Sequence, residues 1–155
     1  MIKNRNSTKD MLTEIFKMQA DLNDHVFKKN GLKDKAGMTL SMDTIFSAVI
    51  ENQLMANDLP NIWLSKYAKA TAEELAELNE ELLWKWWSKD KIDIQNIRVE
   101  LIDILHFLVS AMICAGLSPE RVFDIYRQKH EVNIKRQDSE YSRANKTEND
   151  NKEIR

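Results

Sequence analysis

The sequence predicts an all-α protein, a helical bundle of about five helices. Three glycines and two prolines among 155 residues leave little material for β-hairpin turns or for a glycine-rich phosphate loop. Apolar side chains instead recur at three- and four-residue spacing over long stretches, which is the period of an amphipathic helix. Helix-boundary residues separate these stretches: Gly116 ends one of them, and Ser118 with Pro119 opens the next.

The first two helices are predicted over residues 8–31 and 41–57. The first carries an apolar stripe at helical spacing, and we expect this stripe to face the core. Its members are Met11, Ile15, Met18, Leu22 and Val26.

The third helix is predicted to begin at Pro60, with Asp58 before it as a possible cap, and to extend as far as Lys89. Thr71 and Glu74 have the spacing of a capping box, so the alternative is that the helix starts again at Thr71.

The last two helices are predicted over residues 92–115 and from Ser118 to about Arg136. The fourth is apolar all round, which is typical of a helix buried inside a domain.

Length and composition predict one all-α domain over residues 1–137 and a polar, flexible tail over residues 138–155. The net charge of −2 argues against a nucleic-acid partner. The N-terminus lacks an apolar signal core, and the longest apolar run is interrupted by Asp103 and His106, which argues against a membrane span. A single Cys114 in an apolar run is typical of a buried thiol in a reducing compartment. We therefore expect a cytoplasmic protein.

Two carboxylates interrupt the apolar fourth helix, and no Lys or Arg lies between Val99 and Gly116 to neutralise Glu100 and Asp103. Removing an unpaired carboxylate from water costs several kcal/mol, on the order of the whole stability of a small domain, so a cation is expected nearby. If the third and fourth helices pack antiparallel, four carboxylates would converge as an all-oxygen cluster suited to Mg²⁺ or Mn²⁺. The four are Glu74, Glu77, Glu100 and Asp103. A structural salt-bridge network is the alternative, and a di-iron site is disfavoured because the Glu-x-x-His pairs it needs are absent.

These motifs, in this order, resemble the dimeric all-α dUTP diphosphatases of the wider MazG-like group of nucleoside triphosphate pyrophosphohydrolases. The similarity covers residues from about 10 to 141 and includes "KMQADLND" at 17–24 and "KHEVNIKRQDSEY" at 129–141. Between them stand Glu74-Leu-Ala-Glu77 with Trp84-Lys85-Trp86-Trp87, and Glu100-Leu-Ile-Asp103 with His106-Phe107.

The resemblance implies hydrolysis of dUTP to dUMP and diphosphate by a homodimer or homotetramer, with dUDP as a further substrate. It implies that the four carboxylates named above bind Mg²⁺, for which Mn²⁺ can substitute. Glu74 and Glu77 are the candidate catalytic residues, and Glu74 is the candidate for orienting or deprotonating the attacking water. The chemistry agrees, because a metal polarises the phosphate and lowers the pKa of bound water.

The resemblance also assigns the two ends of the nucleotide. Phosphate contacts fall to Lys129, Asn133, Arg136 and Tyr141, and base or sugar contacts fall to Gln19, Asn23, Trp84, Trp87 and Phe107. From the residues alone, Lys129, Asn133 and Arg136 are more simply an exposed basic edge, and Gln19 with Asn23 is equally a solvated helix shoulder. Trp86 is interpreted as a side chain that packs in the core or at a dimer interface.

The chain departs from the family where many relatives have a glycine before the tyrosine, because Glu140 stands there. It also lacks the long helical insertion of the larger members, so neighbouring subunits are expected to complete its pocket. Two alternative functions stay open: a MazG-like hydrolase of dCTP or modified nucleotides, and a non-catalytic helical interaction module.

Overall fold

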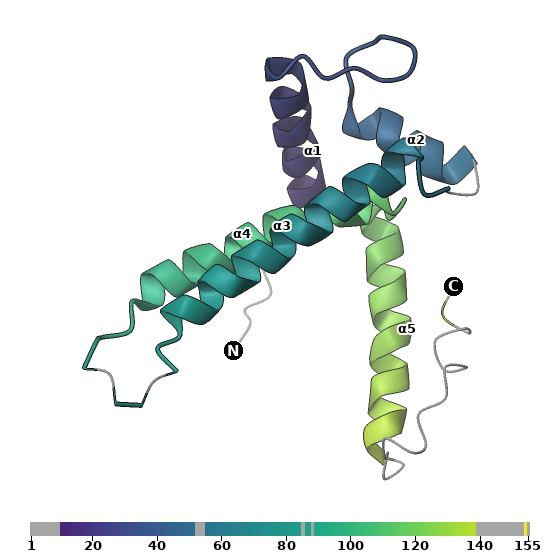
Figure 1. The fold of residues 1–155 in the computed structure, drawn as a ribbon. Coiled ribbons are helices and arrows are strands. Elements are labelled where there is room, and N and C mark those ends of the chain that lie inside the picture. The colour runs from purple at the N-terminus through teal and green to yellow at the C-terminus, as the bar shows by residue number, and fades with distance from the viewer. Residues whose placement is uncertain (1–9, 52–54, 85, 88, 139–153, 155) are drawn as a thin grey trace. The chain divides into compact units, whose positions relative to one another are not determined.

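Helices make up the regular structure of the described part of the chain (Figure 1). The structure, a computed structural model, describes residues 10–51, 55–84, 86–87, 89–138 and 154. Within these residues the only β-type pairing is an isolated bridge between Lys33 and Thr39. The all-α prediction is therefore confirmed. The helices are α1 (Met11–Lys29), α2 (Met42–Glu51), α3 (Leu59–Glu81), α4 (Ile94–Cys114) and α5 (Pro119–Asp138).

The chain divides into two compact units, Met1–Gly116 and Leu117–Arg155. The first contains α1 to α4 and the second contains α5, and each is described by itself. Most of the predicted polar tail, residues 139–153 and 155, lies outside the described residues.

The centre of the first unit is an antiparallel pair of helices, α3 and α4, with α4 also contacting α1 and α2 (Figure 1). A row of aromatic rings ties α1 to this pair. The ring centroids of Phe27 and Trp63 are 4.7 Å apart, those of Trp63 and Tyr67 are 5.8 Å apart, and those of Tyr67 and Phe107 are 6.5 Å apart. Tilted aromatic pairs at these distances add to the stability gained by burying apolar surface.

The boundaries of α3 decide between the two predictions for this segment. The Thr71 hydroxyl donates to the Tyr67 carbonyl at 2.8 Å, a bond inside one continuous helix, so α3 does not start again at Thr71. The predicted extension to Lys89 is wrong, because α3 ends at Glu81 and Leu83 takes a positive φ of 41°. A non-glycine residue in that region turns the chain out of the helix. Trp84, Trp86 and Trp87 consequently lie in the connection to α4.

The buried face of α1 is not the predicted one. The side chains that α1 buries are Phe16, Gln19, Asn23 and Phe27. The apolar stripe expected to face the core is exposed to between 39% and 78%, so that prediction is wrong for this chain. Its members, called the α1 stripe below, are Met11, Ile15, Met18, Leu22 and Val26.

One side of α4 is also exposed, although its sequence predicts burial all round. Leu101, Ile102, Leu105 and Leu108 are between 36% and 53% exposed, whereas Val109 and Cys114 are buried. Burial raises the pKa of the Cys114 thiol to about 12, which makes this group a poor nucleophile. No single described helix is long and apolar enough to cross a bilayer, although α4 and α5 counted together across their break have that length and composition.

Gly116 offers a test of how α4 ends. Its φ is +73°, and a Cβ added there would lie 2.8 Å from Cγ1 of Val49. We expect Gly116→Ala to lower the free energy of unfolding by about 2–4 kcal/mol, the sum of backbone strain and a clash with a stiff side chain. Urea unfolding measures this loss.

Gly37→Ala is the matched control, because Gly37 also has a positive φ, of +80°, but nothing lies within 4 Å of an added Cβ. Its loss should be about 1–2 kcal/mol, from strain alone. Equal losses in the two variants would show that contact with Val49 contributes nothing.

Candidate active site

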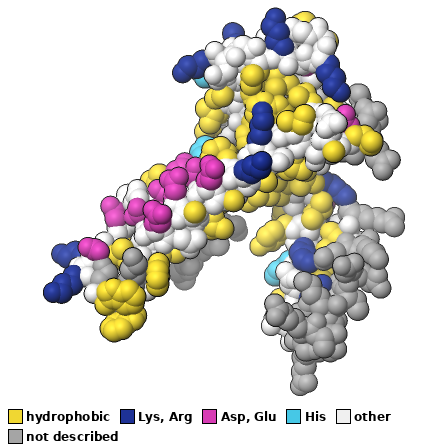
Figure 2. Space-filling view, viewed as in Figure 1, with side chains coloured by type: hydrophobic (Ala, Val, Ile, Leu, Met, Phe, Trp, Pro, Cys, Tyr) yellow, Lys and Arg dark blue, Asp and Glu magenta, His cyan; other side chains and the backbone are white. Residues whose placement is uncertain are grey.

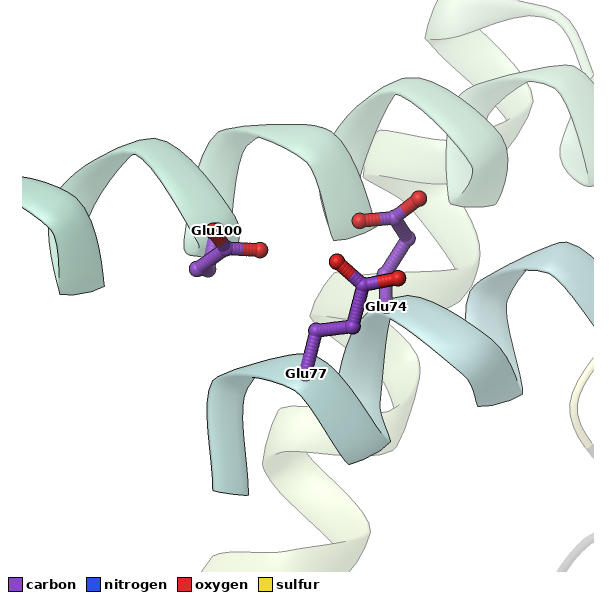
Figure 3. A group of neighbouring side chains, drawn as sticks. All are labelled: Glu74, Glu77 and Glu100. Atoms are coloured by element: carbon purple, nitrogen blue, oxygen red, sulfur yellow. The ribbon is translucent and has the colours of Figure 1, made fainter. Parts of the chain in front are cut away.

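Three glutamates from two helices converge on one face of the α3 and α4 pair (Figure 3). Glu74 and Glu77 lie one turn apart on α3, and Glu100 lies on α4. One carboxylate oxygen from each lies within 4.8 Å of the other two. Glu74 and Glu100 are half-buried, whereas Glu77 is exposed. Antiparallel packing thus brings together two segments that are more than twenty residues apart.

The electrostatics of this group are those of crowded like charges, and acidic side chains form a row along α3 and α4 in Figure 2. Partial loss of hydration raises the pKa of Glu74, and the charges of Glu77, Asp103 and Glu100 raise it further. The pKa of Glu100 is raised by the same loss of hydration and by the charges of Glu77, Asp103 and Glu81. Asp103 lies outside the group of three oxygens but acts electrostatically on both half-buried members.

This donor set determines which cation could be held. All the donors are carboxylate oxygens, the hard ligands that Mg²⁺ and Mn²⁺ accept and that Mg²⁺ complements with water. A zinc site would call for His or Cys among the donors. A divalent cation among these side chains would offset the repulsion that adds to the effect of lost hydration on the pKa values of Glu74 and Glu100. Glu74, Glu77 and Glu100 could therefore hold such an ion, with Asp103 close to them.

Gln19 and Asn23 lie in a polar network between α1 and α4. Nε2 of Gln19 donates to Oδ1 of Asn23 at 3.1 Å, and Nδ2 of Asn23 donates to Oγ of Ser110 at 2.9 Å. Oε1 of Gln19 lies 2.5 Å from Nδ1 of His106. Both carboxamides are buried, with 5% and 7% of their surface exposed, so the solvated-shoulder alternative is wrong.

The structure adds two partners that the sequence interpretation did not assign to this network, His106 and Ser110. They stand one helical turn apart on α4, and the Ser110 hydroxyl donates to the His106 carbonyl at 2.9 Å. Polar residues at this spacing within an apolar helix are the signal that could have identified them.

The aromatic candidates occupy two different places. Phe107 is half-buried and contacts Tyr67 in the aromatic row, one residue from His106. Trp84 and Trp87 lie in the connection after α3, exposed and packed edge to face with ring centroids 6.2 Å apart. Trp86, interpreted as a core or interface side chain, is 88% exposed and therefore does not pack in the core of this chain.

Three of the predicted phosphate contacts share one face of α5 by their spacing, at i, i+4 and i+7. Lys129 and Arg136 are half-buried and Asn133 is exposed. These residues belong to the second unit, which is described by itself. The fourth, Tyr141, lies outside the described residues.

Comparison with known proteins points to one family. A family model described as dUTPase matches residues 11–120. Two curated relatives are the dCTP pyrophosphatases of Enterobacteria phage T4, 29% identical, and of Enterobacteria phage LZ5, 30% identical. Each match covers 79 residues, which are 51% of this chain and 40% of the relative's length. A DNA replication protein of phage T4 is 28% identical over 75 residues, 47% of this chain and 16% of that protein. No solved structure matches the chain.

The crowded carboxylates predict a particular dependence of stability on pH in metal-free buffer. The folded-state pKa values of Glu74 and Glu100 are raised, so the folded protein binds more protons than the unfolded chain. Their contribution is fully present below the unfolded pKa of about 4.3 and is lost as the pH rises through the folded values. Glu74→Gln and Glu100→Gln should each reduce this loss, as measured by urea unfolding with EDTA between acidic and neutral pH.

Glu80→Gln is the control, because Glu80 is exposed and takes no part in raising either pKa. It should leave the pH dependence of wild type unchanged. If all three variants keep the wild-type curve, the carboxylates do not repel one another in the folded protein.

Proposed function

This chain belongs to the dUTPase family, and we propose that it hydrolyses dUTP to dUMP and diphosphate with the help of a divalent cation. The observation that carries the proposal is the group of three carboxylate oxygens contributed by Glu74, Glu77 and Glu100. A rigid pair of helices holds them at fixed spacing, as phosphoryl chemistry requires of metal ligands. Hydrolysis of dUDP to dUMP and phosphate at the same site is part of the proposal.

In this proposal Mg²⁺, or Mn²⁺ in its place, is held by the group of three glutamates together with Asp103. The ion neutralises phosphate oxygens and lowers the pKa of water bound to it. Glu74 is half-buried and has a raised pKa, which suits a carboxylate that orients the attacking water and accepts its proton. Glu77, the exposed member, is the other catalytic candidate and a ligand.

The two ends of dUTP are assigned to different parts of the chain. Gln19 and Asn23 would read the pyrimidine edge, because a carboxamide both donates and accepts hydrogen bonds. Phe107, Trp84 and Trp87 would contact the base or deoxyribose through their ring faces. The phosphates left free by the metal would be bound by Lys129, Asn133, Arg136 and Tyr141.

A second substrate, dCTP, is favoured by a specific observation. Two relatives are named dCTP pyrophosphatases, and the matched segments cover half of this chain. Carboxamides fit cytosine as well as uracil in principle, because each base offers both donors and acceptors. The carboxylate group would act in the same way on either triphosphate. For either substrate, the expected setting is the nucleotide pool of the cytoplasm.

The activity is tested by measuring diphosphate and phosphate release from dUTP, dCTP, dTTP, UTP and dUDP, each with Mg²⁺ and with EDTA. We expect metal-dependent release chiefly from dUTP. Glu77→Gln should lower the rate by roughly 10²-fold or more, because it removes a candidate ligand and catalytic carboxylate. Mg²⁺ should also raise the melting temperature of wild type and not that of this variant.

Glu80→Gln, an exposed carboxylate on the same helix, is the control and should keep wild-type rates. Release from every triphosphate alike would support the carboxylate site and contradict the assignment of Gln19 and Asn23. A wild-type protein that leaves all five nucleotides intact and does not respond to Mg²⁺ would support the interaction-module alternative.

We also propose that the working form is a homodimer or homotetramer, because the α1 stripe is apolar and exposed. Soluble monomers rarely expose contiguous apolar surface of this kind without a partner. The stripe contains no charge that would repel a second copy of itself. Ile15 and Met18 of the stripe also line a small pocket beside Gln19, so a second copy would roof that pocket.

The assembly is tested by light scattering coupled to size-exclusion chromatography. Wild type should have two or four times the chain mass of 18.2 kDa. Leu22→Glu should shift it toward the monomer, because a carboxylate would have to be buried in the interface. Lys17→Gln changes the net charge by the same amount at another exposed position of α1 and should leave the mass unchanged. A wild-type mass of one chain would contradict the proposal.

A further inference from the structure

The hydrogen bonds between α1 and α4 form a ring that begins and ends on one residue. The imidazole of His106 contacts Gln19, Gln19 donates to Asn23, and Asn23 donates to Ser110. Ser110 then donates back to the backbone carbonyl of His106. Four side chains and one carbonyl are therefore linked without a break.

The direction of every bond in this ring follows from its chemistry. A serine hydroxyl has one hydrogen, and that of Ser110 goes to the His106 carbonyl, so its oxygen can only accept from Asn23. Asn23 must then turn its amide nitrogen to Ser110 and its oxygen to Gln19. Gln19 in turn faces His106 with its oxygen, which requires a hydrogen on Nδ1 of His106. In the neutral ring, Nε2 of His106 is left as an acceptor.

Two of the four side chains also border a small pocket. Gln19 and His106 line a pocket of about 220 Å³ whose other lining residues are apolar: Ile15, Met18, Ile102, Leu105 and Val109. An apolar pocket with few, fixed polar groups is the usual form of a small-molecule site. Its volume is below the roughly 300–1,000 Å³ of pockets for larger ligands, which suits one ring.

We propose that His106 directly, and Ser110 through Asn23, are positioning residues that fix which edge of Gln19 donates and which accepts, and thereby set the preference between uracil and cytosine nucleotides. The inference rests on the proposed function. Uracil and cytosine differ at the edge opposite the sugar by an exchange of donor and acceptor. A carboxamide that was free to flip would suit both bases equally. Its selectivity therefore depends on the groups that hold it.

The test is the ratio of kcat/KM for dUTP to that for dCTP, measured with Mg²⁺. Ser110→Ala frees the amide of Asn23, and through it the amide of Gln19, and should move the ratio toward one by roughly tenfold or more, within the usual range for a hydrogen-bonded base contact. The change should fall mainly on KM, since the carboxylates stay in place. His106→Leu should do the same, whereas His106→Asn, which keeps a donor near the position of Nδ1, should retain the wild-type ratio.

An independent measurement tests the direction of the hydrogen bonds in this ring without an activity assay. Nitrogen-15 NMR of the His106 side chain should show the hydrogen on Nδ1 in wild type. The hydrogen on Nε2 alone would overturn the proposed polarity. An unchanged substrate ratio in both Ser110→Ala and His106→Leu would overturn the positioning role while the proposed function stood. If Ser110→Ala fails to fold, the His106 pair and the NMR spectrum decide. A wild type that hydrolyses no nucleotide would overturn both proposals together.

Discussion

The antiparallel packing of α3 against α4 is the interaction on which the rest of this molecule depends. It places Glu74 and Glu77 of one helix against Glu100 of the next, so that like charges meet where hydration is reduced. Such an arrangement lowers stability unless a cation offsets the repulsion. The helices stay paired because the aromatic row, from Phe27 to Phe107, and the buried residues around it hold them together. Repelling groups kept side by side are the pattern expected where a binding site is retained at the expense of local stability.

Helix boundaries followed from the sequence where the local chemistry is strong. Pro119 opens α5 as predicted, and α4 begins at Ile94, two residues after its predicted start, where Asp93 accepts from the amides of Gln95 and Asn96. The face of α1 could not be predicted in the same way. Periodicity shows that a helix has an apolar side, but not whether its own chain or another one covers it. In α1 the face with Gln19 and Asn23 is buried and the wholly apolar α1 stripe is not, because these two carboxamides find hydrogen-bond partners on α4.

The candidate site was likewise predictable from the sequence only in part. The convergence of Glu74, Glu77 and Glu100 was predictable, since helical spacing and the antiparallel packing expected of consecutive helices leave few alternatives. The surroundings of Trp84 and Trp87 were not, because they depend on the turn at Leu83, a non-glycine residue with positive φ that no propensity rule anticipates. His106 and Ser110 were missed as a pair because their role arises only when α1 lies across them.

On the proposed function, α4 joins two separate tasks. Glu100 and Asp103 serve the triphosphate, which every nucleotide substrate shares, and His106 and Ser110 hold the groups that meet the base. These residues recur at three- and four-residue steps, so one helix carries both sets in register. The base preference could then change through the ring of hydrogen bonds while the carboxylates stayed as they are. This separation explains how a chain of the dUTPase family can resemble dCTP pyrophosphatases over half its length.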